Sequence, residues 1–109
     1  MSKPFYITTT LPYVNAELHM GHALEFVRAD AIARYHELIG EEVFFNSGTD
    51  EHGSKIFKKA ESEGKDVKTF VDENVEKFYE SVKLFGVSEN INFIRTSDER
   101  HIKAAQEFW

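Results

Sequence analysis

The sequence predicts an α/β fold in which a mostly parallel sheet is covered by helices. Three short apolar segments of strand character alternate with longer segments of helical periodicity, in the order β-α-β-α-α-β-α. A glycine follows three of the helical segments, where a helix commonly ends. Strands that alternate with helices favour right-handed crossovers and parallel pairing. The 109 residues suffice for one domain or for a piece of a larger one.

The first strand is expected at residues 5–10, and a long helix is expected to begin at residues 19–22. Gly40 is the expected stop of that helix. Apolar residues recur along it every three or four positions, which indicates one buried face. The predicted buried face consists of Met20, Leu24, Val27, Ala31, Tyr35 and Leu38.

The second strand is expected at residues 43–46, because a continuous apolar run is typical of a strand buried on both faces. Ser54 is the expected cap of a short helix through about Glu63. Asp66 is the expected cap of a longer helix that ends at Gly86. The predicted buried stripe of this longer helix is Val67, Val71, Val75 or Asn74, Phe78, Val82 and Phe85.

The third strand is expected at residues 91–95. Thr96 and Glu99 follow it with the spacing of a capping box, so the last helix is expected to begin near Ser97. No stop signal follows before the end of the sequence. Three strands form half of a doubly wound sheet, and we therefore expect the segment to be truncated.

Composition excludes several classes of protein. The sequence has 13 Lys and Arg against 19 Asp and Glu, a net charge of −6, which gives no general attraction to nucleic acid. It contains no cysteine, and therefore neither a disulfide framework nor a thiolate metal site. No apolar run approaches the ~20 residues that cross a bilayer, and the N-terminus does not have the pattern of a secretory signal. The expected location is the cytoplasm, without membrane association.

The residues suited to chemistry follow the first two strands. His19, Gly21 and His22 lie at the predicted start of the first helix, where unpaired N–H groups and a partial positive charge favour anions. The polar segment at residues 48–53 follows the second strand. Since ligands of parallel α/β sheets bind beyond the carboxyl ends of the strands, both segments should open into one crevice.

A His-x-Gly-His sequence at a helix start is typical of two enzyme groups, the class I aminoacyl-tRNA synthetases and the small cytidylyltransferases. Both attack the α-phosphorus of a nucleoside triphosphate and release pyrophosphate. Negative charge grows on the phosphate oxygens in the transition state, and prearranged donors are needed there. The motif alone leaves both groups open, together with a non-catalytic nucleotide-binding segment.

The flanking residues favour one group. Leu-Pro-Tyr-Val-Asn at residues 11–15 and Gly-Thr-Asp-Glu-His-Gly at residues 48–53 closely resemble the methionyl-tRNA synthetase family of class I synthetases. The resemblance runs from about residue 4 to the end. It implies that residues 1–109 are the N-terminal half of a Rossmann-like, doubly wound catalytic domain that binds ATP and methionine.

The resemblance also implies roles for residues around the triphosphate. His19 and His22 would contact the ATP phosphates and stabilise the transition state, and they are the implied catalytic residues. Gly21 would lie against adenine, Glu25 would lie at the nucleoside end, and Asn15 would help to hold the phosphate loop. Mg²⁺ would arrive with ATP as part of the substrate.

Three further residues would bind methionine. Asp50 would pair with its ammonium group, the backbone of Leu11 would accept from the same group, and Leu11 and Tyr13 would line the side chain. An apolar aromatic and aliphatic wall suits a soft thioether. Two alternatives stay open for His52, which either touches substrate or orients the loop by hydrogen bonding, and Glu51 has no assigned role.

The implied activity is formation of methionyl-adenylate and transfer of the methionyl group to tRNA(Met). The second, lysine-containing phosphate loop of the family is missing from these residues. The segment alone is therefore expected to be inactive and, with an exposed face where later strands dock, to self-associate. The family's zinc-binding cysteines are also missing, so any zinc would be bound outside this sequence, which supplies no metal ligands.

Overall fold

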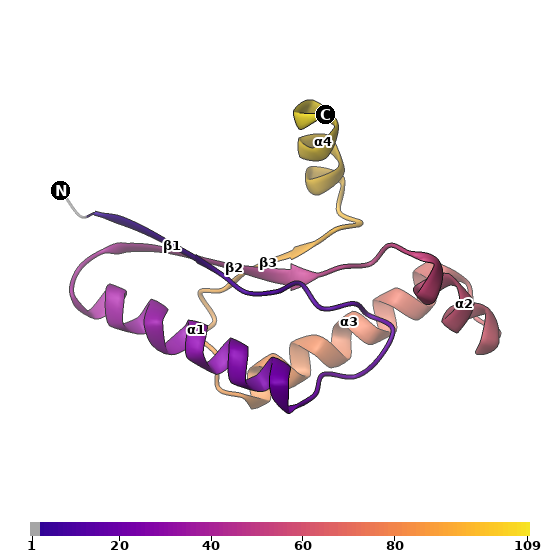
Figure 1. Ribbon diagram of the computed structural model, residues 1–109, viewed down its shortest axis with the longest axis horizontal. Coiled ribbons are helices and arrows are strands. Elements are labelled where there is room, and N and C mark those ends of the chain that lie inside the picture. Colours follow the sequence, from indigo (N-terminus) through magenta and orange to yellow (C-terminus); the bar gives the residue numbers. More distant parts are fainter. Residues whose placement is uncertain (1–2) are drawn as a thin grey trace.

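The structure is a computed structural model that describes residues 3–109. It confirms the predicted α/β class and the predicted order of elements (Figure 1). The elements are β1 (Pro4–Thr8), α1 (Met20–Leu38), β2 (Glu42–Thr49), α2 (Ser54–Ser62), α3 (Val67–Leu84), β3 (Asn92–Arg95) and α4 (Glu99–Phe108).

The three strands form a parallel sheet in the order β1-β2-β3, with Phe5 opposite Val43 and Ser47 opposite Phe93. Each crossover moves one strand along in the same direction. Right-handed crossovers of this kind place their helices on one face of a sheet, and α1 and α3 do lie together on one side (Figure 1). The buried core between them and the sheet includes Phe26, Ala29, Ala33, Phe45, Val82 and Val87.

The predicted buried face of α1 is wrong. Met20 and Leu38 of the predicted stripe are 83% and 87% exposed. The helix instead turns a different face to the sheet, which consists of Ala23, Phe26, Ala29, Asp30 and Ala33. Three alanines let the helix axis approach the strands closely, whereas longer side chains would hold it away. The helix is therefore apolar on two faces, and only the face with small residues is packed.

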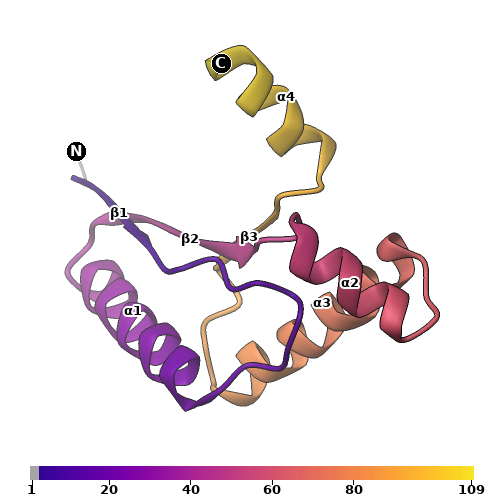
Figure 2. The ribbon, with the colours of Figure 1, turned by 45° about the vertical axis from the view of Figure 1, so that its right-hand side comes forward.

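The prediction that the second strand is buried on both faces is also wrong within the described residues. Phe45 points into the core and is 3% exposed, whereas its neighbour Phe44 is 52% exposed. Phe44 stacks on Tyr6 of β1 on the uncovered face. Figure 2 shows α4 beyond this face and standing away from the sheet, and α4 has no buried residue.

One of three predicted helix caps is present. The cap from Ser54 is wrong, because Ser54 is already the first residue of α2 and this helix begins without a side-chain cap. The Asp66 carboxylate accepts the backbone N–H of Thr69 at 3.1 Å, which confirms it as the cap of α3. The capping box from Thr96 is wrong, because α4 begins at Glu99 without a side-chain cap. The Thr96 hydroxyl instead accepts the backbone N–H of Glu51 at 2.8 Å. The Thr96 hydroxyl therefore stabilises the loop after β2 and does not cap α4.

Candidate functional site

The loop between β1 and α1 ends in a cap made by two histidines. His19 is the N-cap residue of α1, and its Nδ1 atom accepts the backbone N–H groups of Gly21 (3.1 Å) and His22 (3.4 Å). In return, Nδ1 of His22 accepts the backbone N–H of His19 at 3.2 Å. The imidazole rings stack with their centres 3.8 Å apart. The pair thus forms a capping box in which histidine replaces the usual hydroxyl and carboxylate side chains.

This cap determines which ring nitrogens carry protons. Because both Nδ1 atoms accept hydrogen bonds, each neutral ring carries its proton on Nε2. Burial lowers the pKa of His22, the neighbouring His19 lowers it further, and Glu25 opposes them. The neutral form of His22 is therefore favoured. Two Nε2–H groups remain as donors for a ligand, at a helix end that already favours anions.

The glycine between the histidines is required by the same cap. A Cβ atom at Gly21 would lie 2.9 Å from Cε1 and 3.0 Å from Nδ1 of His19. The ring of His19 can therefore fold back over the first turn only because residue 21 has no side chain. The role of Gly21 against adenine stays a prediction, since this contact explains the glycine without a ligand.

The cap should make stability depend on pH. Because the pKa of His22 is lowered on folding, the unfolded chain takes up a proton first as the pH falls below about 6.5. We expect the free energy of unfolding to decrease from pH 7 toward pH 5, and His22→Asn to reduce that decrease, since asparagine caps a helix without titrating. Urea unfolding at several pH values measures this effect, with His101→Asn as the control. An unaltered pH dependence in His22→Asn would contradict the assignment.

The first turns of α1 are joined to the loop just after β1 through Glu25. Its Oε1 atom accepts the backbone N–H of Thr10 at 2.6 Å. Asn15 lies half-buried in a turn of the intervening loop. The predicted phosphate-binding residues therefore lie on one loop and the helix that follows it. Their contact with a nucleotide stays a prediction.

A second group of predicted site residues surrounds Asp50. Tyr13 and Asp50 form a parallel bridge in which Asp50 N–H donates to the carbonyl of Pro12 (3.0 Å) and Val14 N–H donates to the carbonyl of Asp50 (3.3 Å). The bridge extends the pairing of β1 with β2 beyond the ends of both strands. Tyr13 is 53% exposed, and Leu11 and Asp50 are half-buried. The structure thus brings together Tyr13 and Asp50 of the three residues predicted to bind methionine, and Leu11 lies two positions before Tyr13 in the same loop.

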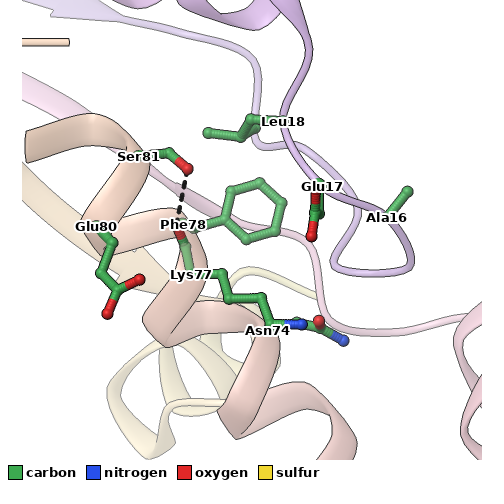
Figure 3. A pocket seen from close by; sticks show the side chains of 8 residues that line it. All are labelled: Ala16, Glu17, Leu18, Asn74, Lys77, Phe78, Glu80 and Ser81. Carbon is green, nitrogen blue, oxygen red and sulfur yellow. Dashed lines mark hydrogen bonds between the residues drawn. The ribbon is translucent and has the colours of Figure 1, made fainter. Parts of the chain in front are cut away.

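The underside of the loop packs on α3, from which the sequence predicted no contribution to the site. Leu18, the residue before the cap, contacts both core clusters. Figure 3 shows it beside the ring of Phe78, at a cavity of about 240 Å³ between the loop and α3. Leu18 therefore anchors the residue next to the histidine cap against α3. The exposed pair Ala16 and Glu17 forms the outer rim of this cavity.

The loop after β2 is held by residues that sequence reasoning missed. Glu51 is buried, and its carboxylate forms an ion pair with Arg95 at the end of β3. His52 Nε2 lies 3.2 Å from the backbone carbonyl oxygen of Thr96. This contact supports the interpretation that His52 orients the loop. The only sequence signal for the ion pair was the position of both charges at strand ends.

Both groups lie at the end of the sheet toward which the strands run (Figures 1 and 2). Within residues 3–109, no hydrogen bond joins either imidazole to Asp50. The same residues contain no group of three or more His, Asp or Glu side chains placed to hold a metal ion. None of their helices combines the length and apolarity that a bilayer crossing requires.

The histidine-capped helix after the first strand of the parallel sheet and the carboxylate after the second strand lie at the two sequence segments that resemble class I aminoacyl-tRNA synthetases. The family model described as "tRNA synthetases class I (M)" matches residues 5–109. The chain belongs to this family, the class I synthetases for methionine.

Individual relatives agree with this assignment. The sequence is 50% identical to the methionine–tRNA ligase of Thermotoga maritima, over 95% of this chain and 16% of that protein. Identity to the methionine–tRNA ligase of Rhizobium meliloti is 44%, over 99% of this chain and 21% of that protein. The fold superposes with a TM-score of 0.94 on Mycobacterium tuberculosis methionyl-tRNA synthetase in complex with methionyl-adenylate, at 39% identity over 98% of this chain and 21% of that one. The chain thus spans about one fifth or less of these relatives.

Proposed function

We propose that the complete protein containing this segment activates L-methionine with ATP and transfers the methionyl group to tRNA(Met). The observation that supports the proposal is that a helix start capped by His19 and His22 follows β1, while the Tyr13–Asp50 bridge lies just beyond the carboxyl ends of β1 and β2. One group suits a negatively charged triphosphate, and the other suits the positively charged ammonium of an amino acid. The names of the relatives supply the amino acid.

In the first step, a carboxylate oxygen of methionine attacks the α-phosphorus of ATP, and pyrophosphate leaves as methionyl-adenylate forms. Nε2–H groups of His19 and His22 donate to phosphate oxygens as their negative charge grows. Mg²⁺ accompanies ATP as part of the substrate. Asn15 holds the loop, Gly21 faces adenine, and Glu25 lies toward the nucleoside. The reaction needs no protein nucleophile, because positioning and charge stabilisation suffice.

Methionine lies over the Asp50 group in this proposal. The carboxylate of Asp50 and the backbone carbonyl of Leu11 accept hydrogen bonds from the ammonium group. The side chains of Leu11 and Tyr13 contact the thioether. Tyr13 is 53% exposed in the structure, so that its ring is available to a ligand.

The remaining parts of the proposal concern the whole protein. Residues 1–109 form the N-terminal half of the catalytic domain, and the isolated segment is inactive and self-associates through its uncovered apolar faces. Any zinc is bound by residues outside this sequence, which contains no cysteine. The protein acts in the cytoplasm, where tRNA is charged.

The test is ATP–pyrophosphate exchange with the complete protein. We expect exchange that requires both ATP and methionine, and in Asp50→Asn a KM for methionine raised about 10–100-fold, the loss expected for a hydrogen bond between charged groups. Asp66→Asn, which keeps a capping side chain at a remote helix start, is the matched control and should leave this KM unchanged. Exchange that depends on CTP without methionine would instead indicate a cytidylyltransferase. No exchange with any nucleotide would indicate a non-catalytic binding protein.

A further inference from the structure

A buried carboxylate lies directly beside Asp50 in the sequence. The side chain of Glu51 is 1% exposed, and its partners lie at the ends of β2 and β3 or in the turn after β3. Its carboxylate accepts the Thr49 hydroxyl at 2.9 Å, Nε of Arg95 at 2.6 Å and Nη2 of Arg95 at 3.3 Å, together with the hydroxyl of Ser97. A carboxylate buried this completely is tolerated because its oxygens are hydrogen-bonded and its charge is paired.

Arg95 continues this network to the surface of α3. Its Nη2 atom donates to Oδ1 of Asp72 at 2.6 Å. Burial alone would lower the pKa of Arg95, but the hydrogen bonds to Glu51 and Asp72 outweigh it and raise the pKa. The hydrogen bond from Lys68, followed by that from Arg95, lowers the pKa of Asp72. Arg95 and Asp72 therefore stay charged at neutral pH, and the contacts of Arg95 with Glu51 and Asp72 join the ends of β2 and β3 to α3.

Asp50 lies between this network and the loop that leads to the histidines. On one side, its backbone is bridged to Tyr13. On the other side, the flanking residues Thr49 and Glu51 are bonded to residues 95–97: the Thr96 N–H donates to the Thr49 carbonyl (3.2 Å), and the Glu51 N–H donates to the Thr96 hydroxyl (2.8 Å). The backbone of residue 50 is thus held between two neighbouring segments, which fixes the direction of its Cα–Cβ bond, and its Oδ1 atom accepts the backbone N–H of His52 at 3.4 Å.

We propose that Glu51 and Arg95 are positioning residues of the amino-acid site, which hold the Asp50 carboxylate in the place where it meets the ammonium group of the substrate. This inference rests on the proposed function and assigns a task to a pair of residues that touch no substrate. A buried ion pair is weak evidence of added stability, since apolar residues of similar volume often stabilise as well. Because Glu51 follows Asp50 directly in the chain, the Glu51–Arg95 pair is expected to affect methionine binding.

The experiment measures methionine and ATP kinetics separately in the complete protein. In Glu51→Gln, we expect the KM for methionine to rise about tenfold, the effect of misplacing one charged hydrogen-bonding group, while the KM for ATP changes less than about twofold. Arg95→Lys keeps the charge but loses the contact through two nitrogen atoms. It should therefore raise the KM for methionine less than Arg95→Met does. The matched control is Asp30→Asn, which weakens the ion pair of the buried Asp30 with the exposed Arg34 in the middle of α1. It should lower the melting temperature and leave both KM values unchanged.

The double variant Glu51→Gln/Arg95→Met separates positioning from stability. Arg95→Met alone leaves the buried Glu51 carboxylate without its partner, and the double variant replaces that carboxylate with a neutral amide. The melting temperature of the double variant should therefore be higher than that of Arg95→Met. The KM for methionine should stay raised, because the side-chain hydrogen bonds between Glu51 and Arg95, which hold the segments on either side together, are still missing. Recovery of the methionine KM together with the melting temperature would overturn the proposal, as would an equal rise of both KM values in Glu51→Gln. If wild-type protein shows no methionine-dependent exchange, the proposed function fails first, and this outcome is distinct from both.

Discussion

Alanine at either His19 or His22 should slow methionine-dependent ATP–pyrophosphate exchange by the complete protein about 10²–10³-fold, the loss measured when one preorganised donor to a developing negative charge is removed. Each imidazole presents one Nε2–H, because its Nδ1 atom is engaged with the backbone. Most of the loss should appear in kcat, since the charge on phosphate grows in the transition state. The initial rate of exchange at saturating ATP and methionine measures it.

The same histidines cap α1, so a loss of activity could also follow from a loosened helix. His19→Ser separates the two effects, because serine keeps a capping oxygen but has no donor that reaches as far as Nε2. We expect His19→Ser to match wild-type protein in stability and His19→Ala in its slow exchange. Exchange restored by serine would show that the cap matters and the donor does not. His101→Ala, on α4, is the control for removal of a histidine and should exchange at the wild-type rate.

Gly48→Ala should be among the most damaging single substitutions in the core of this segment. Gly48 lies opposite Ile94 in the β2–β3 pair, and a Cβ atom there would come within 1.9 Å of the Ile94 carbonyl oxygen. The obstacle is backbone, so it cannot rotate away, and the strands would have to separate. We expect a loss of more than about 3 kcal/mol, beyond the usual cost of overpacking. Urea unfolding of the variant and the wild-type protein measures it.

Gly64→Ala is the matched control for this experiment. Gly64 has a φ of +66° after α2, and a Cβ atom there would meet nothing within 4 Å. Its replacement should cost only about 1 kcal/mol, from the left-handed backbone conformation alone. Equal losses in the two variants would show that β2 and β3 adjust to a side chain at residue 48, contrary to the close approach in the structure.

Much of the site could be predicted from short stretches of sequence. The histidine pair and the segment that ends in Asp50 each follow a strand, and the rule for parallel sheets places both at one edge. The structure brings Tyr13 and Asp50 into one bridge, as expected from two loops at that edge. The Glu51–Arg95 ion pair could not be predicted, because its partners are 44 residues apart and meet only once β2 and β3 are paired.

The sequence by itself determined the order of strands and helices, the family and the position of the histidines at a helix start, because these properties depend on residues close together in the chain. The tertiary structure alone decided that α1 packs through Ala23, Ala29 and Ala33 and leaves Met20 and Leu38 exposed. Both faces of that helix satisfy the same apolar periodicity, and the choice between them depends on how closely the sheet can approach. It also decided the protonated nitrogen of each imidazole, since that depends on the backbone N–H groups that the folded helix start presents to Nδ1.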